Sequence, residues 1–192
     1  MLVKEKKRES SIENRKMTRE ELIKRIKETA YLEGDFVLRS GAQSKYYLDK
    51  YLFETCPDIL KALGEKFAKY VTDDVTLIAG AELGGVALAT VTALETGKNW
   101  IIIRNTKKGY GTGKLVEGAL KPGDVVLLVE DIATTGGQVL EAAKVITEAG
   151  ATVKKIVCVI DRKQGAEQNI TKAGYKFDSI LTKTDLGIKD KD

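Results

Sequence analysis

The residues best suited to chemistry lie together near the middle of the second half of the chain. Glu130 and Asp131 directly follow five apolar residues at positions 125–129, rich in β-branched types, a run typical of a strand buried on both faces of a parallel sheet. Small hydroxyl and glycine residues follow at 134–137, and apolar residues then recur at helical spacing over 139–150, with a glycine where a helix cap is expected. This order predicts a site at the end of a strand.

A turn between a strand and a helix suits a phosphate group. Free backbone N–H groups and the positive end of the helix dipole attract an anion, glycines let it approach the backbone, and threonine hydroxyls add donors. Carboxylates beside a bare phosphate would repel it, so their natural partners are sugar hydroxyls or a metal ion. The segment therefore predicts a site for a phosphorylated sugar; the alternative is an ordinary strand–helix turn with exposed acids.

The segment 126–136, with its two acids, two spacers and Thr-Thr-Gly turn, resembles the phosphoribosyl pyrophosphate signature of the type I phosphoribosyltransferases. The resemblance implies that Glu130 and Asp131 bind the ribose and act in catalysis. It places further contacts to phosphoribosyl pyrophosphate at Thr134, Thr135, Gly136, Gly137 and Gln138.

Composition restricts the chemistry available. The 192 residues carry a formal net charge of +4 and include no histidine, which excludes histidine triads and histidine-based zinc sites. The mild positive charge fits an anionic substrate and does not by itself indicate nucleic acid. No apolar run approaches a membrane span or a signal peptide, and Cys56 and Cys158 have no metal-ligand spacing. We therefore expect a cytoplasmic protein without membrane or nucleic-acid partners.

The length favours one domain. Residues 1–16 are strongly charged and are expected to form a flexible extension; a basic tail that touches nucleic acid is the alternative. Residues 17–192 are expected to form a single domain, with a small hood at about 18–50 and a core at about 57–181.

The expected hood consists of a helix and a hairpin. A capping box of Thr18 and Glu21 starts the helix, and Gly34 is expected to end it. The hairpin that follows has a Phe-x-Leu-Arg-Ser-Gly-x-x-Ser-x-Tyr pattern from Phe36; by itself it predicts only a small surface hairpin. The pattern is similar to the hood of one subfamily, the orotate phosphoribosyltransferases. This resemblance implies that Arg39, Tyr46 and Tyr47 contact orotate, and that Arg39 also contacts phosphoribosyl pyrophosphate.

The remaining elements alternate between helix and strand, as in a mainly parallel sheet flanked by helices. Helices are predicted at 57–71, 86–94 and 166–173, and strands at 76–79, 99–103, 115–118, 151–160 and 175–181. The glycine-bearing turn at 80–85 is similar to the family's second loop, which contacts pyrophosphate with backbone groups.

Residues 104–114 contain three glycines and four cationic residues, which cannot pack as a core element and therefore predict a mobile loop. The segment resembles the family's catalytic loop, which closes over pyrophosphate. Asn105 stands where the family often has a second basic residue, so one of the family's pyrophosphate contacts is not assigned to a residue at this position. The resemblance assigns pyrophosphate contacts to Arg104, Lys107, Lys108 and Tyr110, and catalytic roles to Arg104 and Lys108.

Arg162 follows the predicted strand 151–160 and matches the arginine that holds the orotate carboxylate in the family. Thr134 is expected to contact orotate as well. The alternative for Arg162 is a surface salt bridge.

The resemblance implies the α/β fold of the type I phosphoribosyltransferases and conversion of orotate and phosphoribosyl pyrophosphate to orotidine 5′-monophosphate. It also implies Mg²⁺, held by the substrate's pyrophosphate and ribose hydroxyls with no firm protein ligand, and a homodimer that shares loop 104–114 across its interface. Transfer to another base, such as a purine, and a regulator that senses phosphoribosyl pyrophosphate are the alternatives. The hood pattern and Arg162 favour orotate, and the lysine-rich loop favours an enzyme.

Overall fold

The computed structural model describes residues 16–37, 41, 43–106 and 115–188. The expected N-terminal extension lies almost entirely outside these ranges. So do four of the expected site residues, Arg39, Lys107, Lys108 and Tyr110.

A six-stranded sheet forms the centre of the molecule, in the order β5-β4-β3-β6-β7-β8. Its strands are β3 (Leu77–Ala81), β4 (Asn99–Ile103), β5 (Val116–Glu117), β6 (Val125–Ala133), β7 (Thr152–Asp161) and β8 (Phe177–Thr182). Neighbouring strands are parallel except for β4 and β5. The predicted α/β fold with a mainly parallel sheet is therefore confirmed.

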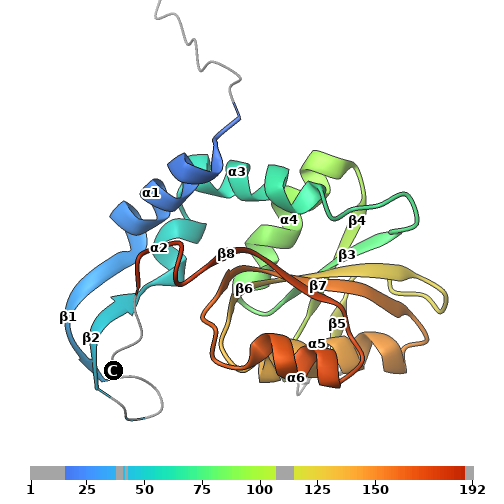
Figure 1. Cartoon of the computed structure of the whole chain (residues 1–192). Coiled ribbons are helices and arrows are strands. Elements are labelled where there is room, and N and C mark those ends of the chain that lie inside the picture. The colour runs from blue at the N-terminus through green and yellow to red at the C-terminus, as the bar shows by residue number, and fades with distance from the viewer. Residues whose placement is uncertain (1–15, 38–40, 42, 107–114, 189–192) are drawn as a thin grey trace, which may run out of the picture.

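Helices cover both faces of this sheet (Figure 1). The longer helices are α1 (Arg19–Ala30), α3 (Pro57–Ala68), α4 (Gly84–Thr96), α5 (Gly137–Glu148) and α6 (Ala166–Lys172). The first three pack on one face, and α5 and α6 pack on the other. Leu127 and Val129 of β6 face the first group, whereas Val126 and Leu128 face the second. Burial on both faces explains why the apolar run of this strand is uninterrupted.

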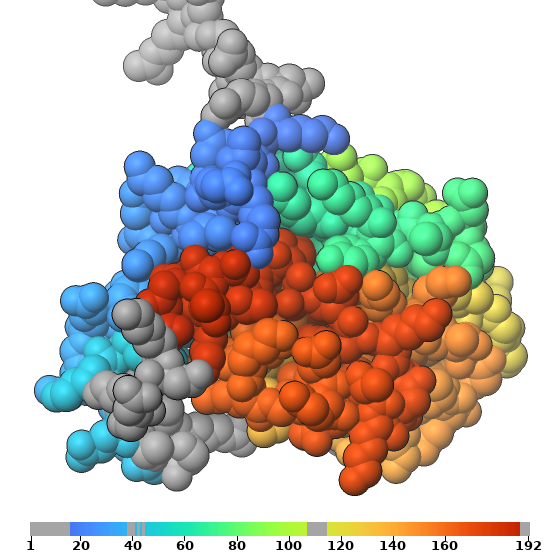
Figure 2. All heavy atoms as spheres, in the orientation of Figure 1, coloured from blue at the N-terminus to red at the C-terminus, as the bar shows by residue number. Residues whose placement is uncertain are grey.

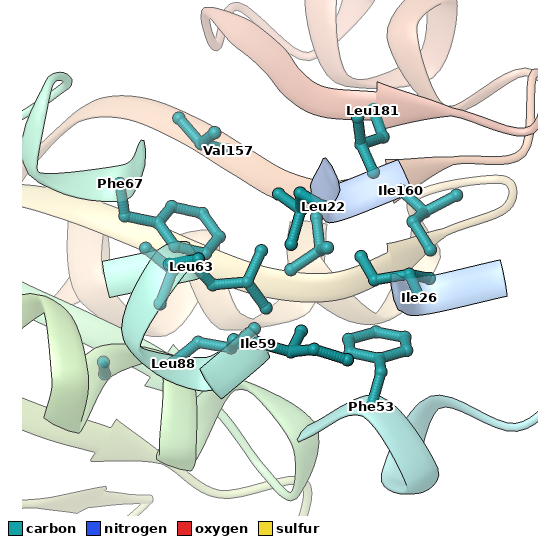
Figure 3. Packing of buried hydrophobic residues seen from close by; sticks show 14 of the residues in the cluster. Leu22, Ile26, Phe53, Ile59, Leu63, Phe67, Leu88, Val157, Ile160 and Leu181 are labelled. Carbon is teal, nitrogen blue, oxygen red and sulfur yellow. The ribbon is translucent and has the colours of Figure 1, made fainter. Parts of the chain in front are cut away.

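The face under α1, α3 and α4 holds the largest buried side chains (Figure 3). Phe67 and Leu63 of α3 lie on it. Phe53 comes from an additional short helix, α2 (Lys50–Glu54), and lies near Ile26 and Ile59. Burying a side chain of this size stabilises the fold by roughly 1.5–3 kcal/mol relative to exposure. The core therefore fixes α2 beside the sheet.

The hood is a separate antiparallel hairpin of β1 (Tyr31–Val37) and β2 (Gln43–Leu48). The capping box starts α1 as predicted, but the prediction that Gly34 ends this helix is wrong. The helix ends at Ala30 because Tyr31 already pairs with Leu48 of β2, and Gly34 lies where the register of the two strands shifts.

Two elements near the predicted site differ from expectation. Strand β6 continues through the two acids to Ala133, because it pairs with β7 as far as Asp161. Helix α2 was not predicted at all, and it follows the hood directly. Both differences bring more side chains to the carboxyl end of the sheet.

The turn after β8 lies against α1 (Figure 2). There Arg19 donates a hydrogen bond to Asp185 at 2.7 Å, which ties the C-terminal part of the described chain to the first helix. Among the described helices, none combines the length and apolar character needed to cross a bilayer.

Candidate active site

A cleft of about 380 Å³ opens at the carboxyl ends of β6 and β7, the edge at which open α/β sheets bind ligands. Strand β2, helix α2 and the turn between β6 and α5 border it. Lys50, which no motif assigned, lines the cleft. So do nine of the residues expected to bind substrate: Tyr47, Glu130, Asp131, Thr134, Thr135, Gly136, Gly137, Gln138 and Arg162.

The turn before α5 presents the start of a helix to the cleft. Gly136 has a left-handed conformation (φ +80°), and no side chain caps the helix. A Cβ at this position would lie 3.0 Å from Ile170 of α6, and Asn169 of α6 donates a hydrogen bond to the Thr135 carbonyl at 2.9 Å. The turn is therefore held in place by α6, and helix α5 begins beside the cleft without a side-chain cap, an arrangement that suits an anion.

The two acids lie within β6 and are almost fully buried. Asp131 accepts a short hydrogen bond from the Ile132 N–H, and its other oxygen lies 2.5 Å from the Lys50 ammonium. Glu130 accepts from the Asp131 N–H at 3.0 Å, while its second oxygen is buried without a partner. Burial, and after it the charge of Asp131, raises the pKa of Glu130 well above its usual value. Glu130 is therefore expected to hold a proton more readily than an ordinary glutamate.

Helix α4 approaches the second acid closely through a glycine. A Cβ added to Gly84, its first residue, would lie 1.5 Å from the Asp131 carboxylate. A Cβ at Gly80 would likewise lie 2.2 Å from the Gly85 carbonyl, so the helix is pressed onto β3. The glycines of the turn 80–85 therefore make room for the acid and for the close approach of α4 to β3.

The sequence did not point to two side chains that lie beside Asp131, those of Lys50 and Glu54. Both lie on α2 and both interact with Asp131. Burial, and after it the charge of Asp131, raises the pKa of Glu54 to about 8. A signal for the helix was present in Asp49, whose carboxylate accepts a hydrogen bond from the Tyr51 N–H as an N-cap. Five residues are too few for a periodic apolar pattern.

Three of the residues expected to bind the base, Tyr46, Tyr47 and Arg162, lie on the hood side of the cleft. Arg162 donates a hydrogen bond to the Tyr46 hydroxyl at 3.1 Å, and its guanidinium lies 5.8 Å from the centre of that ring. Tyr46 in turn stacks on Tyr31 with ring centres 5.8 Å apart. Tyr47, the next residue, is half-exposed and lines the cleft. The stack therefore holds the Arg162 guanidinium at the edge of the cleft.

The first residues of the cationic loop are tied to the turn 80–85. Asn105 donates to the Glu82 carbonyl at 2.8 Å, and the same carbonyl accepts from the Gln138 side chain at 2.8 Å. Gln138 also donates to the Asn105 amide oxygen at 3.2 Å. Arg104 lies 3.6 Å from the Glu82 carboxylate. Asn105 thus joins three segments, a role for which a basic side chain would be poorly suited because it cannot accept a hydrogen bond.

Comparison with known proteins agrees with this geometry. Residues 53–187 match the phosphoribosyl transferase domain family. Over 167 residues the chain is 39% identical to an orotate phosphoribosyltransferase of Methanocella arvoryzae, covering 86% of this chain and 95% of the relative. Over 172 residues it is 44% identical to that of Pyrococcus abyssi, covering 88% and 94%.

A solved structure shares the fold. The crystal structure of Mycobacterium tuberculosis orotate phosphoribosyltransferase in complex with phosphoribosyl pyrophosphate matches with a TM-score of 0.76 at 28% identity, covering 88% of this chain and 99% of that one. The domain match, the near-complete coverage of the relatives and the shared fold agree with the motifs. The chain belongs to the orotate phosphoribosyltransferase family.

Proposed function

We propose that the cleft transfers the phosphoribosyl group of phosphoribosyl pyrophosphate to orotate, which gives orotidine 5′-monophosphate and pyrophosphate in pyrimidine synthesis. One observation carries this proposal: the turn at the start of α5, two buried acids and an arginine that lies over the Tyr46 ring line the same cleft. Each matches a different part of the two substrates. The names of the relatives support the same reaction.

The charges suggest how the reaction is accelerated. As the bond from the anomeric carbon to pyrophosphate breaks, positive charge develops on the sugar ring and negative charge on the leaving group. Glu130 and Asp131 would hold the ribose hydroxyls and favour the cationic ring. Orotate brings an anionic ring nitrogen that forms the new bond, so the site needs no strong protein base.

The leaving group would be stabilised by the cationic loop. Arg104 lies 3.6 Å from the Glu82 carboxylate, too far for a direct hydrogen bond, so the pair is loose enough for a pyrophosphate to replace it. Lys107, Lys108 and Tyr110 are proposed to join it from the part of the chain outside the described residues. Loop closure would also exclude water from the activated sugar.

We also propose that Mg²⁺ binds with the substrate. Among the described residues no group of three acidic or thiol side chains is arranged so that it could hold a metal ion, and the Lys50 ammonium already lies against Asp131. Oxygen donors of the pyrophosphate and ribose suit this hard cation. When bound, Mg²⁺ would neutralise charge on the leaving group.

We also propose that residues 1–16 form an extension outside the domain of residues 17–192, and that the protein is cytoplasmic.

The reaction can be tested by pyrophosphate release. We expect release from phosphoribosyl pyrophosphate only when orotate is added, and none with adenine or hypoxanthine. Arg162→Ala should raise the KM for orotate about 10- to 150-fold, because a charge-assisted contact of about 1.5–3 kcal/mol is lost. The KM for phosphoribosyl pyrophosphate should change little.

The matched control is Arg25→Ala, which removes an exposed arginine that pairs with Asp58 on the helical face. This variant should keep both KM values. Equal effects of Arg162→Ala on both substrates, or release that depends on a purine, would contradict the proposed base site.

We further propose a two-fold dimer in which loop 104–114 serves the neighbouring site, as the family resemblance implies. Lys108→Ala and Asp131→Asn should each be inactive as purified proteins. Mixed equally after reversible dissociation, they should recover about one quarter of wild-type activity. Random pairing makes half the dimers hybrid, and each hybrid has one site without a lesion.

Native mass spectrometry would confirm that hybrids form. If the loop serves its own subunit, every site carries one lesion and the mixture stays as inactive as its parents. That outcome would reject the shared site without affecting the proposed reaction.

A further inference from the structure

Helix α2 carries two charged side chains toward the ribose acid. Lys50 and Glu54 are four residues apart, which places them on the same side of a helix. Between them Phe53 is fully buried in the core, near Ile26 and Ile59 (Figure 3). The helix therefore has little freedom to rotate, and both charged side chains have fixed positions beside Asp131.

Three carboxyl groups meet at this point, those of Glu54, Glu130 and Asp131, and one ammonium group, that of Lys50. All three acids are at least nine-tenths buried. One oxygen of Glu54 and one of Glu130 are buried without a hydrogen-bond partner. In this buried site, three ionised carboxylates would repel one another more strongly than one ammonium group could offset. One of the three acids is therefore expected to retain a proton.

The two sides of Asp131 differ. Lys50 is about one third exposed and lines the cleft, with its ammonium 2.5 Å from the Asp131 carboxylate. Glu54 is only 5% exposed, does not line the cleft, and has one buried oxygen without a hydrogen-bond partner, while the charge of Asp131 acts on it from β6. A hydrogen bond between two carboxyl groups requires that one of them is protonated, and Glu54 is the better candidate because burial, and after it the charge of Asp131, raises its pKa to about 8.

We propose that Lys50 and Glu54 are positioning residues for Asp131, with Lys50 as its counter-ion on the cleft side and protonated Glu54 as its hydrogen-bond donor on the buried side. The proposal rests on the proposed function, in which Asp131 holds the ribose. Neither residue exchanges a proton with the substrate. Together they fix the direction of the carboxylate while leaving it capable of accepting ribose hydroxyls, since each carboxylate oxygen can accept more than one hydrogen bond.

The proposal has a pH signature. Above about pH 8 Glu54 loses its proton, and with it the hydrogen bond to Asp131. The ionisable groups that face Glu54 are Asp131, Lys50 and Asp49, with Glu130 next to them on β6. Activity of the wild-type protein should therefore fall as the pH rises through 8, in addition to any fall that the substrates cause.

The test compares two substitutions of Glu54. Glutamine keeps a hydrogen-bond donor and cannot ionise, so kcat of Glu54→Gln should no longer show the fall near pH 8. Methionine has a similar length and no donor, so Glu54→Met should have a lower kcat across the whole pH range. Glu148→Gln is the control, because it makes the same chemical change at an exposed residue at the far end of α5 and should keep the wild-type profile.

Lys50 is tested separately. Lys50→Met should lower kcat/KM for phosphoribosyl pyrophosphate about tenfold, because a charge-assisted contact is lost, while Lys50→Arg should restore most of it. Lys154→Met, which removes an exposed partner of Asp74, should have no effect.

Calorimetric binding of phosphoribosyl pyrophosphate gives a readout that does not depend on turnover. If Glu54→Gln keeps the wild-type fall near pH 8, or if Glu54→Met matches Glu54→Gln at every pH, the role of Glu54 is rejected. If Lys50→Met binds and turns over like the wild type, the role of Lys50 is rejected. Absence of orotate-dependent activity in the wild-type protein would instead reject the proposed function itself.

Discussion

Asp131→Asn is expected to lower kcat about 10³-fold while the fold is retained, because it removes the charge that would stabilise the developing cation on the ribose. The amide has the shape of the carboxylate and still accepts the Ile132 N–H on one side. Lys50 loses its partner but is about one third exposed and can turn toward water. Loss of the charge also removes one cause of the raised pKa of Glu54. The buried cluster should therefore tolerate the change.

Steady-state rates, circular dichroism and thermal melting would be measured together. Asp74→Asn is the matched control, because Asp74 makes an exposed ion pair with Lys154 and lies before β3, at the opposite edge of the sheet from the cleft. Activity of Asp131→Asn within a few-fold of the wild type would show that this acid does not stabilise the sugar cation. If Asp131→Asn lowers the melting temperature strongly, the rate would be measured instead in the double variant Glu54→Gln/Asp131→Asn, which removes a further ionisable group from the buried cluster.

The turn at 134–137 and the two acids before it were predictable because they are local. A buried strand, a Thr-Thr-Gly turn and a helix start are specified within a dozen residues, and the structure places them in that order along the cleft. What the sequence left open is how far the strand continues. Pairing of Ile132 and Ala133 with β7 extends β6 beyond the acids, and such pairing depends on residues about 28 positions away.

The missed part of the site comes from distant segments. Lys50 and Asp131 are 81 positions apart, and no spacing rule connects them. Helix α2 is too short for a helical pattern, and its buried Phe53 is explained only by the core it enters. A lysine and a glutamate four residues apart usually indicate a solvated helix surface, and only the fold shows that these two face a buried acid.

Asn105 illustrates a different limit. In the sequence it is a departure from a family pattern and suggests a lost pyrophosphate contact. In the structure its amide both donates to Glu82 and accepts from Gln138. Asparagine at this position links the turn 80–85 to helix α5, where a basic side chain could instead have contacted pyrophosphate. This link could be recognised only from a structure in which the two segments lie side by side.

Gly84→Ala is expected to lower kcat/KM about 10²-fold, because a misplacement of about 1 Å in a catalytic group has an effect of that size. The added methyl group would lie 1.5 Å from the Asp131 carboxylate, so one of the two must move. The acid is held by Lys50 and Ile132. Helix α4 cannot withdraw easily, since Gly80 and Gly85 bring it into backbone contact with β3.

A double-mutant cycle separates this clash from a general effect on the helix. In the wild-type background Gly84→Ala should destabilise the fold by about 1–3 kcal/mol through overpacking, measured by urea unfolding. In an Asp131→Ala background the nearest carboxylate atoms are gone, so the same substitution should cost much less, since residues in contact are not additive. Equal destabilisation in both backgrounds, together with near-normal activity of Gly84→Ala alone, would show that the close approach of α4 does not position the acid.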